Sequence, residues 1–206
     1  MTRSDSKNQG QKPAAAKSGK EVKQDRRQLI LKTTLRVIAE EGVAAVTHRR
    51  VASAAGIPLG STTYHFESRL HLLREAFDYY LDINIAKYRS LSADLAIETI
   101  DDLVDFILMM NDRHYAGEPI LLAEYELTLF AARDPAIARS LHAWDELSVS
   151  SMARHLETLG AAKPFDAART VVYLVRGYEL DRLSYHQGDP KDLRQRMKVV
   201  IEAFVT

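Results

Sequence analysis

The sequence contains no cysteine. This absence excludes a disulfide framework, a thiolate zinc site, an iron–sulfur cluster and a cysteine nucleophile, and it fits a reducing compartment. The sequence also has no apolar run near the roughly 20 residues of a membrane helix, and no charged-then-apolar signal at its N-terminus. We therefore expect a soluble, cytoplasmic protein with no membrane partner.

Strand-like alternation of apolar and polar residues is absent as well. Apolar residues instead recur at helical spacing in nearly every segment, as Leu31, Leu35 and Ile38 do at i, i+4 and i+7. Hydrophobic residues make up 46% of the 206 residues, enough for the core of one or two domains. No internal repeat is present. The sequence predicts an all-α fold with nine helices.

Glycines, capping residues and prolines mark where these helices begin and end. The first helix is expected to end at Gly42. The others are expected to span about 47–56, 58–66, 68–88, 98–111, 119–133, 135–159, 164–186 and 190–205.

Charge is distributed unevenly along the chain, although the net charge is zero. Residues 1–74 carry 14 Lys and Arg against 6 Asp and Glu, and residues 75–206 carry the opposite excess. A basic front indicates a polyanionic partner, with a chance difference between two halves as the alternative. Residues 1–23 are polar, basic and poor in large apolar side chains, which predicts a disordered arm or a solubilising tail.

The most informative segment is Thr47 to Arg69. Its two short predicted helices are joined by a tight turn at Gly56-Ile57-Pro58. The small Ala52 allows close helix packing, and Gly56 suits a backbone with positive φ. This pattern predicts a helix-turn-helix, whose second helix enters the major groove of DNA.

Short hydroxyl side chains on that second helix can approach base edges, and the arginines around it can contact phosphates. A solvated surface charge explains any one arginine equally well, but the combination favours DNA binding. We expect Thr62 to read a base, and Arg49 and Arg69 to contact phosphates. The candidate DNA contacts are Thr47, His48, Arg49, Arg50, Leu59, Gly60, Ser61, Thr62, Thr63, Tyr64, His65 and Arg69.

Several short motifs in residues 26–75 together resemble one known family. They are Ala39-Glu40-Glu41-Gly42, Thr47, Val51-Ala52, Ala55-Gly56-Ile57, Gly60, Tyr64-His65-Phe66 and Leu70-His71-Leu72-Leu73. In this combination the segment, about a quarter of the chain, is similar to the DNA-binding domain of TetR-family transcriptional regulators. Arg69 stands where that family often has Lys, and Pro58 and Leu59 stand where it often has polar residues.

The resemblance implies a three-helix DNA-binding domain over residues 24–74 and a larger helical domain over residues 75–206. The larger domain would bind a small-molecule effector and form a homodimer through the last two helices. The implied function is a regulator of double-stranded operator DNA, most often a repressor that a small apolar or amphipathic ligand releases. The alternative is an all-helical ligand-binding or scaffolding protein whose helix-turn-helix is unused.

Aromatic, methionine and polar residues of the C-terminal domain are candidates for an effector pocket, with ordinary core packing as the alternative for each. They are Tyr80, Asn84, Tyr88, Phe106, Met109, Met110, Tyr125, Thr128, Trp144 and Met152. Other apolar residues are candidates for a dimer face, although burial within one subunit explains the same pattern. They are Leu141, Leu147, Val171, Val172, Val175 and Tyr178.

Catalytic motifs are lacking. The acidic cluster of Asp101, Asp102 and Asp105 lies near a predicted helix start, where the helix dipole explains it. No histidine pair has the i, i+4 spacing of a helical zinc site, and the sequence has no phosphate-binding glycine loop and no nucleophile elbow. We expect neither an enzyme nor a metal or other cofactor.

Overall fold

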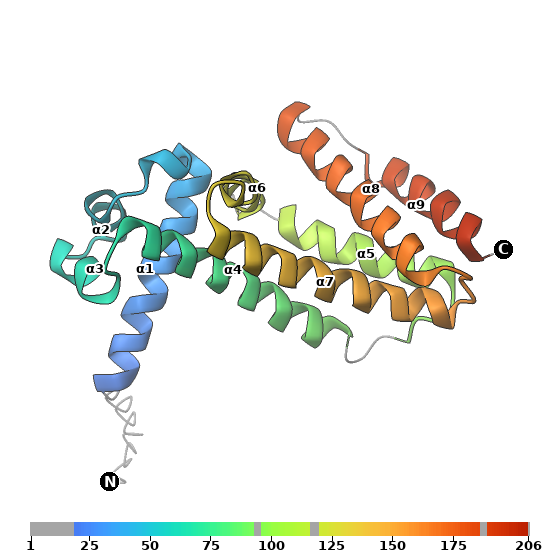
Figure 1. The fold of residues 1–206 in the computed structure, drawn as a ribbon, viewed down its shortest axis with the longest axis horizontal. Helices are drawn as coiled ribbons and strands as arrows, with labels where there is room; N and C mark the ends of the chain where they lie inside the picture. The colour runs from blue at the N-terminus through green and yellow to red at the C-terminus, as the bar shows by residue number, and fades with distance from the viewer. Residues whose placement is uncertain (1–18, 93–95, 116–119, 186–188, 206) are drawn as a thin grey trace, which may run out of the picture.

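The computed structural model describes residues 19–92, 96–115, 120–185 and 189–205, and over these ranges the fold is entirely helical (Figure 1). This confirms the predicted fold class. The described residues form nine α-helices and a short 3₁₀ turn, η1. Their bounds are α1 Gly19–Glu41, η1 Val43–Ala45, α2 His48–Ala55, α3 Leu59–His65, α4 Arg69–Ser92, α5 Ile100–Tyr115, α6 Ile120–Ala131, α7 Pro135–Thr158, α8 Pro164–Tyr185 and α9 Pro190–Val205.

The predicted N-terminal arm differs from the structure at its end. Helix α1 begins at Gly19, so residues 19–23 are helical rather than part of an arm. Residues 1–18 of that prediction lie outside the described residues.

Local chemistry fixes the helix ends around the predicted helix-turn-helix. Gly42 has φ 83° and Gly56 has φ 63°, a backbone region that side chains with a Cβ rarely adopt. The hydroxyl of Thr47 accepts a hydrogen bond from the Arg50 backbone N–H at 3.0 Å and so caps α2. The predicted signals at these three residues therefore act as expected.

Two hydrophobic cores lie along the length of the molecule. The first joins α1, α2 and α4 to α6 and the start of α7, and Phe66, Phe77 and Leu127 are among its fully buried residues. The second joins α5, α7, α8 and α9. Helix α4 runs from the part formed by α1 to α3 toward the C-terminal half. Helix α6 lies between these two parts of the molecule (Figure 1). The predicted DNA-binding segment thus shares a continuous core with α6.

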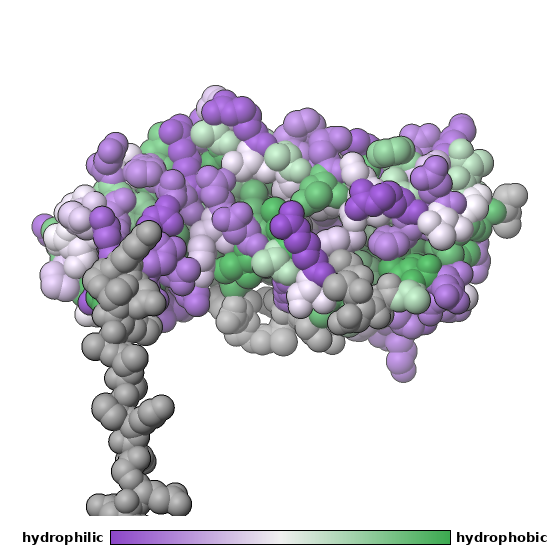
Figure 2. Space-filling view, turned by 90° about the horizontal axis from the view of Figure 1, so that it is seen from below, coloured by the Kyte–Doolittle hydropathy of each residue, from purple (hydrophilic) through white to green (hydrophobic). Residues whose placement is uncertain are grey.

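The surface differs between the two ends. Figure 2 shows polar and intermediate side chains over the end formed by α2 and α3, and hydrophobic patches over the C-terminal half. Among the described helices, none combines the length and the apolar character needed to cross a bilayer.

Candidate DNA-binding surface and ligand cavity

The corner between α2 and α3 is built as the sequence predicts. The N–H of Ile57 donates to the carbonyl of Ala52 at 3.0 Å, which closes the turn after Gly56. Val51 is buried in the first core, and Ala52 is buried as well. The corner therefore holds α3 rigidly against α2 and leaves one face of α3 outside.

That outer face of α3 carries most of the predicted base-reading residues. Gly60 and Thr63 are exposed, Leu59 is 44% exposed and Tyr64 is 69% exposed, whereas Ser61 is half-buried. Small residues at the exposed positions would let the helix backbone lie close to the floor of a groove.

The prediction that Thr62 reads a base is wrong. Its side chain is fully buried, and its hydroxyl donates to the carbonyl of Leu59 at 2.8 Å. The helical period turns Thr62 toward α2, where the carbonyl of His48 also lies 3.4 Å from the same hydroxyl. Thr62 therefore fixes α3 against α2 rather than facing a partner.

The predicted phosphate ligands fall into different settings. Arg49 is exposed. Arg50 forms an ion pair with Glu41 through short contacts, and its Nε lies 2.9 Å from both carboxylate oxygens. Arg69 donates to the carbonyls of Val43 and Val46 at 2.7 and 2.8 Å, so it secures the turn after α1. Of the three arginines, Arg49 is therefore the most accessible to a phosphate.

The remaining predicted DNA contacts also have defined surroundings. Thr47 is exposed beside the helix that it caps, whereas the Nδ1 atom of His48 is buried and has no hydrogen-bond partner among the described residues. His65 is half-buried at the end of α3. Burial lowers the pKa of His65, and the nearby charges of Lys23, Arg27 and Arg26 lower it further.

The basic residues of α1 were not among the predicted DNA contacts. The Nζ of Lys23 lies 4.9 Å from the ring centroid of Tyr64, so the start of α1 lies beside α3. Lys23 and Arg26 are exposed, whereas Arg27 pairs with Glu75. The i, i+3 and i+4 spacing of these cations was the available signal, because it places them on one side of the helix.

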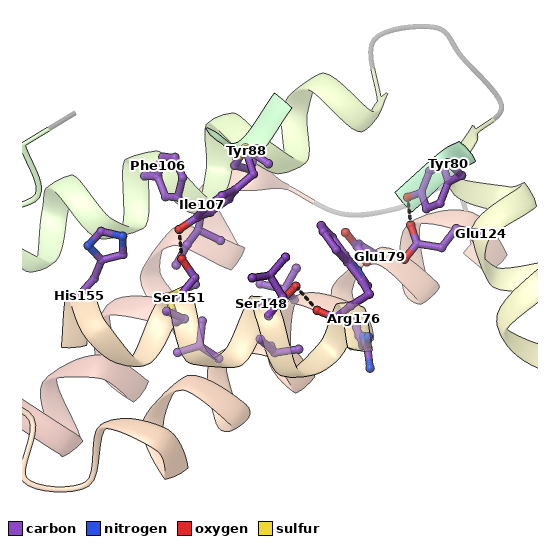
Figure 3. A pocket seen from close by; sticks show the side chains of 17 residues that line it. Tyr80, Tyr88, Phe106, Ile107, Glu124, Ser148, Ser151, His155, Arg176 and Glu179 are labelled. Carbon is purple, nitrogen blue, oxygen red and sulfur yellow. Dashed lines mark hydrogen bonds between the residues drawn. The ribbon is translucent and has the colours of Figure 1, made fainter. Parts of the chain in front are cut away.

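A cavity of about 170 Å³ lies between α4, α5, α6, α7 and α8 (Figure 3). Six of the predicted pocket residues line it: Tyr80, Tyr88, Phe106, Met110, Trp144 and Met152. The other four predicted residues, Asn84, Met109, Tyr125 and Thr128, are not among its lining residues. Asn84 instead donates to the carbonyl of Tyr80 at 2.9 Å within α4.

The cavity also has a polar end whose carboxyl groups were not among the predicted pocket residues. Glu124 accepts a short hydrogen bond from the hydroxyl of Tyr80, and Glu179 lies beside it (Figure 3). Burial raises the pKa of Glu124, and burial together with the charge of Glu124 raises that of Glu179 to about 8. A Glu inside the apolar run of α6 was the sequence signal for this end.

The predicted dimer face lies mostly inside the subunit. Val171 is fully buried in the second core, Val172 and Val175 line the cavity, and Leu141 packs against the first core. Leu147 lines the cavity at 40% exposure, and the hydroxyl of Tyr178 is buried. The prediction is wrong for Val171, because an apolar stripe does not reveal whether it packs within one chain or between two.

The outer face of α8 is a different set of residues. Phe165, Tyr173 and Leu180 are 60%, 59% and 50% exposed, and Arg169 and Gly177 are exposed along the same side. Val199 of α9 is 61% exposed.

Two sequence families match the chain. Residues 98–206 match the tetracyclin repressor-like C-terminal domain, and residues 30–76 match the bacterial regulatory proteins of the tetR family. The C-terminal match covers more than half of the chain.

Curated relatives match the N-terminal part. The HTH-type transcriptional regulator YerO of Bacillus subtilis is 36% identical over 72 residues, which is 35% of this chain and 25% of YerO. The HTH-type transcriptional repressor KstR2 of Rhodococcus jostii is 38% identical over 81 residues, which is 39% of this chain and 38% of KstR2. The chain therefore matches well under half the length of either relative.

Solved structures match over most of the chain. The transcriptional regulator SCO7518 of Streptomyces coelicolor A3(2) is 31% identical, with a TM-score of 0.68 over 86% of this chain and 98% of that protein. The multidrug binding protein EbrR, in complex with ethidium, is 27% identical, with a TM-score of 0.64 over 85% of this chain and 98% of that protein. These matches confirm the predicted resemblance and favour a regulator over an enzyme. The chain belongs to the TetR family of transcriptional regulators.

Proposed function

We propose that the chain acts in the cytoplasm as a homodimeric repressor that binds a pseudo-palindromic operator. One observation carries this proposal: the outer face of α3 presents small and polar residues, and exposed cations of α1 and α2 flank it. Exposed Lys and Arg supply sequence-independent attraction to phosphates, and side chains of α3 supply base contacts. Repression is supported by the similarity to KstR2.

The two-domain division is part of the proposal. Residues 24–74 would form the DNA-binding domain, and residues 75–206 would bind an effector and the second subunit. Among similar structures, EbrR holds imidazole in one complex and ethidium in another. The cavity between α4 and α8 is the corresponding site that we propose for this chain.

We propose that α6 carries the response to a bound ligand from the cavity to the DNA-binding end, which is the part of the molecule formed by α1, α2 and α3. Glu124 of α6 lines the cavity, and Glu126, two residues later, accepts a hydrogen bond from the backbone N–H of Val43 at 3.2 Å. Val43 follows α1, and α1 packs against α6 in the first core. A ligand that binds one position of α6 better than another would shift the DNA-binding end accordingly.

The dimer face that we propose is the exposed stripe of α8, which contains Phe165, Arg169, Tyr173, Gly177 and Leu180, together with Val199 of α9. Large apolar side chains at this exposure favour a protein contact. Paired helices from two subunits would form a four-helix bundle there.

Selection of binding sites from a pool of random duplexes tests the function. The proposal predicts an enriched sequence with two inverted half-sites, and protection of that sequence in the DNA upstream of the chain's own gene. A pool that shows no enrichment, with only salt-sensitive non-specific binding, would contradict sequence-specific regulation.

A further inference from the structure

The acidic end of the cavity is lined by two carboxyl groups, Glu124 from α6 and Glu179 from α8. Glu179 is 8% exposed, and its Oε2 lies 2.9 Å from the hydroxyl of Tyr125. Glu124 accepts from Tyr80 through its own Oε2. The two carboxyl groups lie close enough together that the charge of Glu124 raises the pKa of Glu179. Carboxyl groups held together in a poorly hydrated site are costly unless a cation lies against them.

The neighbouring charges do not neutralise the pair. Arg176 is the cation beside these carboxyls, and its guanidinium is directed to Asp145 of α7 by a short ion pair. Three carboxyl groups, those of Glu124, Glu179 and Asp145, therefore share one guanidinium. Tyr80 and Tyr125, the other titratable groups at this end, are uncharged because burial raises the pKa of both hydroxyls far above neutral pH.

The rest of the cavity wall is mainly aromatic and aliphatic. The hydroxyls of Ser148 and Ser151, which also line it, are hydrogen-bonded to the Trp144 carbonyl and to the Tyr88 hydroxyl. Trp144, Tyr88 and Phe106 line it, and His155 lies beside Phe106 at the end away from Glu179 (Figure 3). Burial and the nearby charge of Arg154 lower the pKa of His155, which favours its neutral form. Arg154 donates to the hydroxyl of Ser151 at 3.2 Å. Aromatic faces attract organic cations, and a cavity of about 170 Å³ has room for a ring-sized molecule.

We propose that this cavity is built for a compact organic cation, an amine or quaternary ammonium with an aliphatic or aromatic body, whose charge lies against Glu124 and Glu179. The effector role of such a cation rests on the proposed function, but its binding does not. An anionic ligand would meet two carboxyl groups and a guanidinium already paired with Asp145. A neutral apolar ligand would leave the two carboxyl groups without a counter-charge.

Binding should be linked to protons at Glu179. Burial and Glu124 keep this carboxyl largely protonated at pH 7, because they raise its pKa to about 8. A bound cation favours the ionised form, so binding should release a proton. Affinity for the cation should then increase from pH 6 to pH 8.

A matched pair of probes tests the charge. Benzyltrimethylammonium and 2,2-dimethylpropylbenzene have the same shape, and a carbon replaces the nitrogen in the second. Trp144 is the only tryptophan, so its fluorescence reports binding in the cavity. We expect the full-length protein at pH 8 to bind the cation about tenfold or more tightly than its neutral counterpart.

Glu124→Gln and Glu179→Gln test the residues. Each should lower affinity for the cation about tenfold while leaving affinity for the neutral probe unchanged, which shows that the cavity is intact. The matched control is Glu157→Gln, an equivalent change at an exposed site of α7. Absent or equal binding of the cation, or a preference for it that survives both substitutions, would overturn the proposal. A cation that binds as expected without changing DNA affinity would contradict only the effector role.

Discussion

Adjacent side chains at the α2–α3 corner have different surroundings, so their substitution should have different effects. Arg49 is exposed, and it should contact phosphate. Arg49→Ala should weaken binding to every duplex sequence and reduce the slope of log affinity against log salt by about one. Anisotropy titrations over a range of salt measure that slope. Lys163→Ala, at the opposite end of the molecule, should leave it unchanged, and an unchanged slope for Arg49→Ala would remove Arg49 from the phosphate contacts.

The buried hydroxyl of Thr62 predicts a structural effect instead. Thr62→Val keeps the shape of the side chain and removes its hydrogen bond to the Leu59 carbonyl. The free energy of unfolding should fall by about 1 kcal/mol, as measured by urea denaturation. The order of preference among DNA sequences should stay the same. A changed preference at one base pair with unaltered stability would restore Thr62 as a base-reading residue.

Glu179 should make stability depend on pH. Its pKa is raised to about 8 in the folded state from the ordinary value of 4.5, so folding binds its proton more tightly. The stabilisation is complete below pH 4.5 and is lost as pH rises through 8. Glu179→Gln should therefore flatten the decline in unfolding free energy between pH 5 and pH 8. Parallel declines in the two proteins would contradict the raised pKa.

Residue roles were predictable where they depend on neighbours in sequence. Thr47 caps α2 as expected because its partner is three residues away. The contacts of Arg69 with Val43 and Val46 cross more than 20 residues. The sequence could therefore identify Arg69 as a cation near the motif but not as one that secures the turn after α1.

At the scale of elements, α6 connects the cavity to the DNA-binding end. Glu126→Ala removes the carboxylate that bonds the Val43 N–H at 3.2 Å. We expect little change in the affinity for benzyltrimethylammonium alone or for DNA alone. The ratio of DNA affinities with and without that cation should move toward one. The check is a DNA titration at saturating cation.

Leu129→Ala is a suitable control for this experiment. Leu129 lies on α6 three residues after Glu126, and its side chain is 74% exposed. The control should keep the full effect of the cation on DNA affinity. A full effect in Glu126→Ala as well would show that α6 does not carry the response through this contact.

The ends of the helices could be predicted from the sequence, because nearby residues determine them. Which side of a helix faces the core and which faces a second subunit could not be predicted. Gly42 and Gly56 end helices through their own backbone geometry. The apolar side of α8 faces α7, α9 and the cavity, and its outer side is the mixed stripe with Phe165 and Tyr173. Which side faces a second subunit depends on the positions of other helices, and the sequence pattern of α8 alone does not contain that information.

For the whole molecule, the outer stripe of α8 predicts the oligomeric state. Tyr173→Asp places a charge in the proposed dimer face, where the native side chain is 59% exposed. Sedimentation should show a monomer in place of a dimer, and operator affinity should fall steeply because one DNA-binding end binds alone. Leu129→Asp, at an exposed apolar site on α6, is the matched control and should leave the dimer intact. A dimer that persists in Tyr173→Asp would place the interface elsewhere.

The uneven charge along the chain agrees with this arrangement. The basic part of the sequence contains α1 to α3, where Lys23, Arg26 and Arg49 are exposed and Lys23 lies over the Tyr64 ring of α3. The acidic part contains the cavity and the proposed dimer stripe. The sequence alone predicted that one part of the molecule is basic and the other acidic. It could do so because net charge is a sum over residues and does not depend on their contacts.

Methylation interference on the selected operator tests the central claim most directly, because methylation at guanine N7 blocks the major groove. Two subunits that each insert α3 should give two inverted clusters of interference, with centres one helical turn, about 10 base pairs, apart or a multiple of that spacing. A variant with Gly60→Asp in α3 should lose both clusters while it remains folded. A single cluster, or interference only from methylation at adenine N3 in the minor groove, would contradict the account.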